Sequence, residues 1–175
     1  MTSQITNNFD LLKDKIILDA TAGYRMMHYD KKHPNVLYID QRPECEPDQV
    51  QDFRKLPYPD NSFKLIIFDP PHIIQKTKYC STNMVRRFGM LEAETWQHDL
   101  KLAFNELFRV LDDYGVLVFK WNNHQLCSHD IINLSPVKPI VYQVSSNRHR
   151  KGSKAGSDSI QTLWFTFMKF PEACI

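Results

Sequence analysis

The segment Leu65-Ile66-Ile67-Phe68-Asp69-Pro70-Pro71-His72 indicates which kind of sheet this chain forms. Its four apolar residues predict a buried parallel strand, because the run is too short and too closely followed by proline for a helix. Each proline forces the residue before it out of the α region, so we expect Asp69 and Pro70 to be extended. The carboxylate and the imidazole then leave the carboxyl end of the strand, the edge where open α/β sheets bind ligands.

Composition predicts one globular domain over residues 1–175. The chain has 42% apolar and 24% charged residues and a net charge of +2, so overall charge says little about its partners. The cysteines lie far apart, without a C-x-x-C pair, which is typical of free thiols in a reducing compartment. We see neither a signal peptide nor an apolar run long enough for a membrane span, and therefore expect a cytoplasmic protein without a membrane partner.

Apolar runs alternate with helical periodicity along most of the chain, which predicts a mostly parallel sheet. No helical pattern separates the last two runs, so we expect them to pair antiparallel. The predicted fold is therefore α/β, a Rossmann-like, doubly wound, mostly parallel sheet with an antiparallel C-terminal hairpin. The expected strands are 16–19, 36–40, 50–53, 65–69, 116–121, 137–144 and 160–168; the expected helices are 24–29, 92–111 and 124–134, with a long loop over 73–90.

Carboxylates close the first, second and fourth of these strands, at Asp19, Asp40 and Asp69, and Asp52 lies beside the third. Acids gathered at one edge repel one another, so they imply a ligand with hydroxyls, amines or positive charge. Gly23 stands alone where a dinucleotide fingerprint needs three glycines, and no P-loop is present. Asp40 lies twenty-one residues after Asp19, the spacing at which an acid meets ribose hydroxyls. S-adenosyl-L-methionine has a ribose, an ammonium and a sulfonium group, and fits this edge.

Histidines give no sign of a metal centre. His28 with His33, and His124 with His129, have no third ligand at a suitable spacing. We therefore expect no metal.

The ordered set Asp19-Ala20-Thr21-Ala22-Gly23, Asp40, residues 52–63 and Asp69-Pro70-Pro71-His72 resembles a class I S-adenosylmethionine-dependent methyltransferase over residues 14–122. The resemblance implies that Asp19 through Gly23 surround the methionine part of the cofactor. It implies that Asp40 holds the ribose, that Gln41 lies near the adenine, and that Asp52 and Phe53 flank it. The loop has fewer glycines than usual, so Ala20 and Ala22 would serve as its small residues. We also expect Arg25 to pair with the methionine carboxylate.

Asp69-Pro70-Pro71-His72 is similar to the Asp/Asn-Pro-Pro-aromatic element of amino-methylating nucleic-acid methyltransferases. In that family the carboxylate oxygen and a proline-held carbonyl accept hydrogen bonds from an exocyclic amine, which exposes the nitrogen lone pair. The aromatic residue stacks on a base that is single-stranded or flipped out. Here the aromatic residue is His72, which can stack but can also donate, accept or take a proton. We therefore expect the Asp69–His72 element to be catalytic.

Basic and aromatic residues outside this element are the candidates for binding the target. They are Lys76, Lys78, Arg86, Arg87, Trp121, Arg148 and Arg150. Two basic stretches on a nearly neutral chain favour phosphate contacts, so we expect DNA or RNA as the target. The chain has no room for a separate target-recognition domain, so either selectivity is low or a partner subunit or a second copy selects the site. The alternatives are a small-molecule or protein methyltransferase with His72 as general base, and a non-catalytic nucleic-acid-binding protein.

Overall fold

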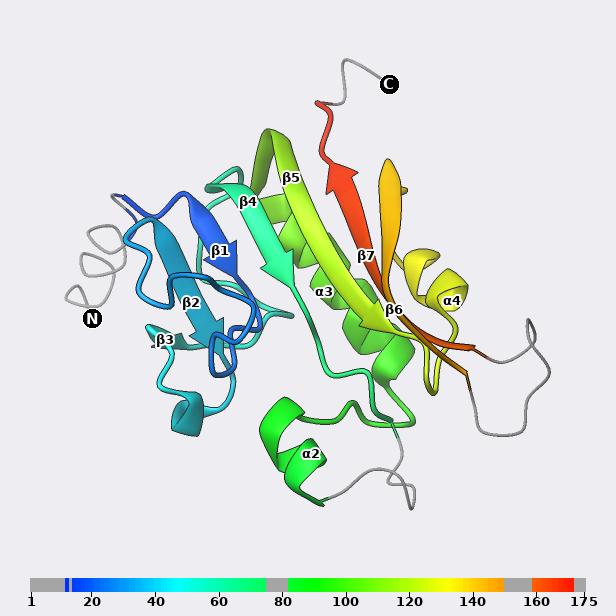
Figure 1. Ribbon diagram of the computed structural model, residues 1–175. Helices are drawn as coiled ribbons and strands as arrows, with labels where there is room; N and C mark the ends of the chain where they lie inside the picture. Colours follow the sequence, from blue (N-terminus) through cyan, green and yellow to red (C-terminus); the bar gives the residue numbers. More distant parts are fainter. Residues whose placement is uncertain (1–11, 13, 75–81, 150–158, 172–175) are drawn as a thin grey trace.

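The computed structural model describes residues 12, 14–74, 82–149 and 159–171. Its sheet has seven strands in the order β3-β2-β1-β4-β5-β7-β6 (Figure 1). Strands β1 to β5 are parallel, whereas β7 runs antiparallel between β5 and β6. The mostly parallel sheet and its antiparallel C-terminal hairpin are therefore confirmed. The strands are β1 (Ile17–Asp19), β2 (Val36–Asp40), β3 (Gln49–Val50), β4 (Phe63–Phe68), β5 (Leu111–Asn122), β6 (Val141–His149) and β7 (Ser159–Met168).

Two of the predicted helices, 92–111 and 124–134, are present but shorter than predicted, and two of the described helices were not predicted. The described helices are the 3-10 helix η1 (Pro43–Cys45) and the α-helices α2 (Thr82–Phe88), α3 (Trp96–Val110) and α4 (Ser128–Ile132). The predicted helix over 24–29 is wrong: this segment consists of turns, because Gly23 and Arg25 both adopt positive φ, at 49° and 54°. The predicted loop over 73–90 contains α2. The third strand precedes its predicted position, so Asp52 and Phe53 lie in the turn after it.

The strand order reverses between β1 and β4, which is where a parallel sheet opens a crevice at its carboxyl edge. In the β1–β4 pairing Asp19 lies opposite Ile67, and the β4–β5 pairing places Phe68 opposite Phe119. The loops that leave β1, β2, β4 and β5 therefore meet at one edge, the lower edge in Figure 1. Helix α2 lies beyond this edge, across the carboxyl ends of the strands.

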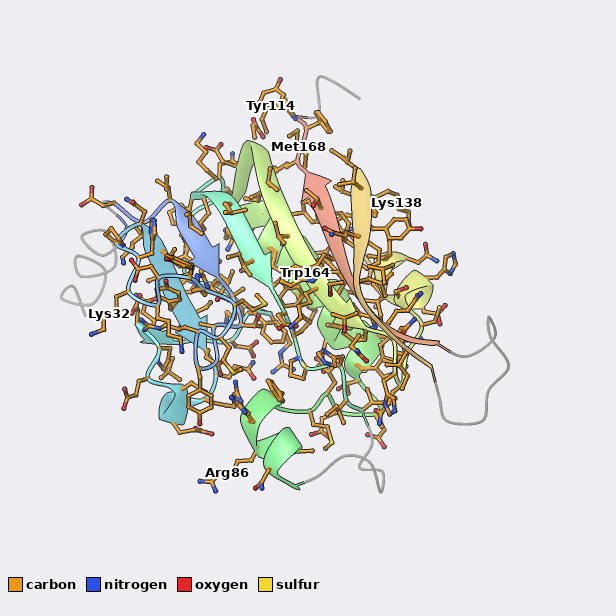
Figure 2. All side chains as sticks on the ribbon, in the orientation of Figure 1. Lys32, Arg86, Tyr114, Lys138, Trp164 and Met168 are labelled. Carbon is orange, nitrogen blue, oxygen red and sulfur yellow. The ribbon has the colours of Figure 1, made fainter. Side chains whose placement is uncertain are left out.

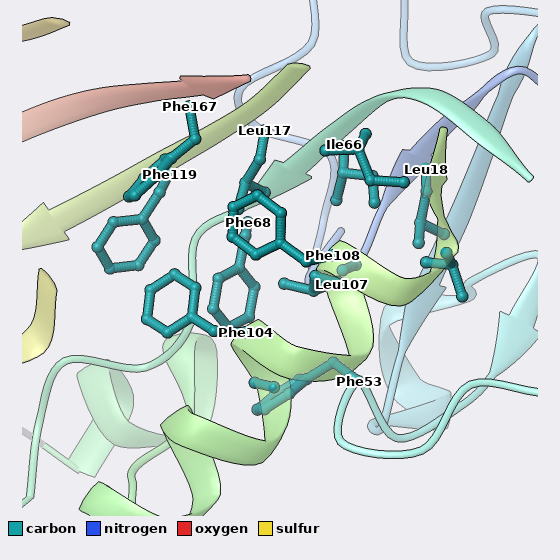
Figure 3. Close-up of a cluster of buried hydrophobic side chains, with 14 of the residues drawn as sticks. Leu18, Phe53, Ile66, Phe68, Phe104, Leu107, Phe108, Leu117, Phe119 and Phe167 are labelled. Atoms are coloured by element: carbon teal, nitrogen blue, oxygen red, sulfur yellow. The ribbon is translucent and has the colours of Figure 1, made fainter. Parts of the chain in front are cut away.

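An aromatic cluster fills the space between the sheet and α3 (Figure 3). Phe68 from β4 lies edge-on to Phe104 from α3 and Phe53 from the turn after β3, with ring centroids 5.9 and 5.3 Å apart. Helix α3 buries one face, which includes Leu100, Phe104 and Leu107. Because Phe68 is fully buried immediately before Asp69, the core fixes the position from which the catalytic candidate element leaves the sheet.

The opposite face of β4, β5 and β7 has no described helix in front of it in Figure 1. Trp164 and Met168 stand on this face (Figure 2) and are partly exposed. Lys120 belongs to the same face, because it alternates with the fully buried Phe119 and Trp121 along β5.

No described helix has the length and apolar content that crossing a membrane requires. Within the same residues, no group of three or more metal-ligating side chains comes together. Cys45 is buried and Cys127 exposed, and both are free thiols; Cys80 and Cys174 lie outside the described residues.

Candidate functional site

Two adjoining cavities open at the carboxyl edge of the sheet. The larger is about 230 Å³ and is lined by Ala20, Thr21, Asp40, Gln41, Arg42, Phe53, Asp69, Pro71, Phe88, Gly89 and Met90. The smaller is about 60 Å³ and is lined by Asp19, Thr21, Ala22, Gly23, Tyr24, Met26, Met27, Arg42, Asp69, Pro70, His72, Arg87 and Phe88. Both cavities touch Thr21, Arg42, Asp69 and Phe88, so they form two parts of one site.

The loop after β1 connects this site to the predicted catalytic element. Thr21 donates its backbone N–H to Asp19 Oδ1 over 3.1 Å, and its hydroxyl accepts the backbone N–H of Asp69 at 2.7 Å. Asp19 is 1% exposed, and its Oδ2 lies 2.7 Å from His28 Nε2. Burial raises the pKa of Asp19, while the hydrogen bond from His28 opposes that rise. The loop therefore fixes Asp69 through its backbone and leaves the Asp69 side chain for other contacts.

Asp40, at the end of β2, has both carboxylate oxygens fully engaged. Oδ1 accepts the backbone N–H and the Nε–H of Arg42, each at 2.9 Å. Oδ2 accepts Gly23 N–H at 2.8 Å and Arg42 Nη2–H at 3.0 Å. A carboxylate offers about four lone-pair positions, so these four bonds use its acceptor capacity. A ribose hydroxyl can therefore bind Asp40 only if at least one hydrogen bond from Arg42 breaks.

Arg42 also reaches α2. Its Nη1 donates to the backbone carbonyl of Arg87 at 2.6 Å, at the carboxyl end of that helix, where carbonyls lack intrahelical partners. Gly89 follows with φ 78°, and a Cβ there would lie 3.0 Å from Pro71 Cγ. Arg42 thus links the end of α2 to Asp40 of β2, and Gly89 lies close to Pro71 in the bend after β4. Phe88 lines both cavities.

Asp69 is the residue that both cavities share at the end of β4. Its Oδ2 accepts a hydrogen bond from Lys120 Nζ at 2.6 Å. Its Oδ1 is buried and has no hydrogen-bond partner among the described residues. A buried acceptor without a donor costs roughly 1–3 kcal/mol, so this oxygen marks a place where a donor is missing.

His72 lies beside Asp69 and lines the smaller cavity. Its Nδ1 is 3.2 Å from the Pro70 carbonyl oxygen, and its ring meets Trp121 edge-on at 5.8 Å between centroids. Burial lowers the pKa of His72, and the nearby Lys120 charge adds to this effect, while the charge of Asp69 opposes it. A neutral ring that donates Nδ1–H to Pro70 keeps a lone pair on Nε2.

Most predicted site residues line the two cavities, but Arg25 does not. Its guanidinium donates to Asp48 Oδ1 at 2.9 Å and to the backbone carbonyls of Lys31 and Glu46, and it lies over the Tyr38 ring. The structure thus assigns Arg25 to the contact between the 20–35 loop and the segment after β2. Gly23 rather than Arg25 reaches the acid of β2.

Asp52 also lies outside the cavities. Its carboxylate is held by Arg54, which in turn donates to Asp99 of α3 at 2.8 Å. Burial acts to raise the pKa of Asp52, but the bonds from Arg54 outweigh it and lower the pKa. The neighbouring Phe53 does line the larger cavity, as predicted for a residue near the adenine.

The predicted target-binding residues divide into three groups. Trp121 is 0% exposed and donates Nε1–H to the Leu126 carbonyl, so the prediction that its ring binds the target is wrong. Arg87 lines the smaller cavity, and Arg86 extends outward from α2 (Figure 2). Arg148 lies in β6, paired with Ile160. Lys76, Lys78 and Arg150 lie outside the described residues.

Three contributors to the site were missed by sequence reasoning: Arg42, Lys120 and His28. Arg42 follows an acid by two residues, a spacing at which its backbone N–H can return to that carboxylate. Lys120 interrupts an apolar strand on the face opposite Phe119, and in register it is the neighbour of Asp69. Nothing in the sequence indicated that His28 belongs to the site, because its contact with Asp19 depends on the irregular turns of the 20–35 loop.

The sequence matches no protein-family model and no curated protein. Solved structures do match it. A S-adenosylmethionine-dependent methyltransferase from Methanosarcina mazei aligns with a TM-score of 0.57 at 13% identity, over 97% of this chain and 98% of that one. The chain has the fold of a class I methyltransferase.

Two further matches show how different the reactions on this fold are. A 1,6-didemethyltoxoflavin N1-methyltransferase from Burkholderia thailandensis, solved with S-adenosylhomocysteine, aligns with a TM-score of 0.54 at 11% identity, over 96% of this chain and 82% of that one. The [4+2]-cyclase SpnF aligns with a TM-score of 0.56 at 11% identity, over 94% and 80%. Because one fold carries a methyl transfer and a cyclisation, the reaction has to be argued from the residues of the site.

Proposed function

We propose that this protein is a S-adenosylmethionine-dependent methyltransferase that methylates nitrogen, and that its acceptor is an exocyclic amine of a DNA or RNA base. The observation that carries the proposal is Asp69. It follows a buried strand, belongs to both cavities, and has one carboxylate oxygen that receives no hydrogen bond from any residue that the structure describes. An amine hydrogen of a bound acceptor would supply that donor.

The chemistry of the lining residues fits the cofactor. Acids from three strand ends suit its ammonium, sulfonium and ribose groups, and Phe53 offers an apolar ring to the adenine in the larger cavity. Asp40 would hold the ribose after Arg42 yields, and the loop from Asp19 to Gly23 would surround the methionine part. When bound, the cofactor supplies an electrophilic methyl group on a positively charged sulfur.

The residues of this chain would then prepare the acceptor nitrogen. Asp69 Oδ1 and the second lone pair of the Pro70 carbonyl accept its two hydrogens, which turns the nitrogen lone pair toward the methyl carbon. With the cofactor bound, the nitrogen would accept the methyl group that the cofactor supplies, and the electron pair of the broken carbon–sulfur bond would stay on sulfur. The methylated nitrogen then releases one proton, for which neutral His72 offers Nε2.

Exposed cations beside the site support a nucleic-acid acceptor. Arg87 lines the smaller cavity and Arg86, next to it on α2, is exposed. Cations beside a site for a flipped base can neutralise backbone phosphates. A small molecule or a protein is the second candidate acceptor, for which neutral His72 would serve as general base.

The proposal is tested by transfer of a tritiated methyl group to separate pools of DNA, RNA, protein and small amines. We expect label in DNA or RNA, and we expect Asp69→Ala to lower kcat by about 10²–10³ fold, as removal of a positioned hydrogen-bond partner does. Asp112→Ala is the matched control, because Asp112 also pairs with a lysine across β4 and β5 but at the end of these strands away from the site. Label confined to protein or small amines would refute the nucleic-acid acceptor, and full activity of Asp69→Ala would refute the role of Asp69.

Salt dependence of binding separates the acceptors independently. Arg86→Glu should weaken binding to single-stranded DNA or RNA and flatten its dependence on salt. Lys32→Glu makes the same charge change at an exposed residue distant from Arg86 in Figure 2, and should leave binding unchanged.

A further inference from the structure

Lys120 and Asp69 come from neighbouring parallel strands. Phe119 of β5 pairs with Phe68 of β4, so the next residue on each strand continues the same row. Phe119 turns into the core, and Lys120 therefore turns to the opposite face of the sheet, from which its ammonium reaches Asp69 Oδ2 at 2.6 Å. Strand register thus brings a cation to the acid of the predicted catalytic element.

The surroundings of Lys120 restrict where its ammonium can lie. Nζ is 3.8 Å from Met27 Sδ, in the loop after β1, and 5.6 Å from the centroid of the Trp164 ring on β7. The side chains of Lys120 and Asp69 are 24% and 18% exposed, so solvent has limited access to the ion pair. An ion pair in partly buried surroundings is less screened than one on the surface, and its charge-assisted bond is directional.

The two oxygens of Asp69 are in different states as a consequence. Oδ2 is occupied by Lys120, whereas buried Oδ1 has no donor among the described residues. A carboxylate held at one oxygen cannot rotate freely about its last torsion. Its second oxygen is therefore presented in one direction.

We propose that Lys120 is a positioning residue for methyl transfer: by holding Asp69 at Oδ2, it presents Oδ1 to the amine of the acceptor. This inference rests on the proposed function of Asp69. Orientation of a reacting group supplies a large part of the rate in such reactions, and a displacement of about 1 Å can cost about 10²-fold. Lys120 acts through Asp69, so its loss should lower kcat and leave cofactor binding intact, because Lys120 lines neither cavity.

The test compares Lys120→Met, Lys120→Arg and Lys64→Met in whichever acceptor pool the wild type labels. Lys64 forms an ion pair with Asp112 between the same two strands at their other end, so Lys64→Met removes a matched pair away from the site. We expect Lys120→Met to lower kcat roughly 30-fold or more while the cofactor Kd changes by less than about twofold, consistent with lost positioning. Lys120→Arg should restore much of kcat, and Lys64→Met should leave it unchanged.

A double variant separates positioning from a structural role. Lys120→Met should cost little further kcat in an Asp69→Ala background, because the carboxylate that it positions is gone. Retention of wild-type kcat in Lys120→Met, or equal additional losses in both backgrounds, would overturn the inference. A parallel loss of cofactor affinity would overturn it too, since Lys120 would then act on the cofactor.

If the wild type labels no pool, the proposed function fails. The inference about Lys120 can then still be tested by a crystal structure of Lys120→Met. We expect the Asp69 carboxylate to rotate in Lys120→Met and to keep its orientation in Lys120→Arg. An unchanged carboxylate in Lys120→Met would refute the positioning role, whatever the activity. If Lys120→Met does not fold, the kcat of Lys120→Arg and the orientation of its carboxylate decide the question.

Discussion

Asp40 and Asp69 stand at the ends of two parallel strands and line the same cavity, yet their carboxylates are held differently. Asp40 is bound at both oxygens, by Arg42 and by the N–H of Gly23. Within the described part of the chain, Asp69 is bound at one oxygen only, by Lys120. Arg42, the cation beside Asp40, follows that acid by two residues in the chain. Lys120, the cation beside Asp69, belongs to the neighbouring strand β5.

Because of this difference, we expect Asp40 and Asp69 to bind a ligand in different ways. A saturated carboxylate such as Asp40 can bind a new ligand only by exchanging partners, so ligand binding there is coupled to the movement of Arg42. Asp69 can accept one hydrogen bond without losing any. We therefore expect a ligand that binds Asp40 to displace Arg42, and a ligand that binds Asp69 to leave its ion pair with Lys120 in place.

Among the variants that test this comparison, removal of the Asp40 charge should have the largest effect. We expect Asp40→Asn to weaken cofactor binding by about 10–100 fold, because hydrogen bonds to a charged group contribute roughly 1.5–3 kcal/mol. The chemical step, measured as kcat at saturating cofactor, should change little. Isothermal titration calorimetry and single-turnover methyl transfer measure the two quantities separately. A loss of kcat at unchanged Kd would mean that the assignments of the two acids are reversed.

Releasing Asp40 from its own cation should have a smaller effect of the opposite sign. Arg42→Met frees acceptor positions on Asp40, so we expect the cofactor to bind about 3–10 fold more tightly, the range set by one or two net hydrogen bonds. The same change removes the bond from Arg42 Nη1 to the Arg87 carbonyl, so amide hydrogen exchange at the end of α2 should become faster. Weaker cofactor binding in this variant would show instead that Arg42 contacts the cofactor directly.

The parts of the site that depend on strand ends could be predicted from the sequence. Apolar runs closed by Asp19, Asp40 and Asp69 locate the strands, and parallel pairing brings their carboxyl ends together whatever the details of packing. The proline bend after Asp69 could be predicted because the ring of proline restricts its neighbour. These features depend on local chemistry.

The hydrogen bonds that occupy the carboxylate oxygens of Asp40 and Asp69 could not be predicted. The pair of Lys120 with Asp69 depends on strand register, which one sequence does not specify. The turns over 24–29 depend on positive φ at Gly23 and Arg25, which a helical pattern of side chains does not show. Trp121 was misplaced for a related reason: the last residue of the predicted strand 116–121 could lie at the rim of the site, but the strand continues to Asn122 and Trp121 is fully buried.

His72 offers the finest test of the β4 side, since it sits between Asp69 and the core. Its pKa is lowered, with burial as the main cause, so the folded protein resists protonating it while the unfolded chain takes up that proton near pH 6.5. The unfolded state then binds more protons below about pH 6.5, and stability falls there with a slope of at most about 1.4 kcal/mol per pH unit for this one group. Above pH 6.5 the contribution should be constant.

Chemical denaturation between pH 5 and 8 measures this slope. We expect His72→Phe, which keeps an aromatic ring against Trp121, to remove part of the loss of stability between pH 6.5 and 5. His129→Phe is the matched control, because it makes the same replacement at a histidine that is 78% exposed. If His72→Phe shows the same pH dependence as the wild type, the pKa of His72 is not lowered in the folded protein, and burial does not keep its ring neutral below pH 6.5. If His72→Phe reduces the slope, the ring is neutral in the folded protein below pH 6.5, as the proposed role of His72 as proton acceptor requires.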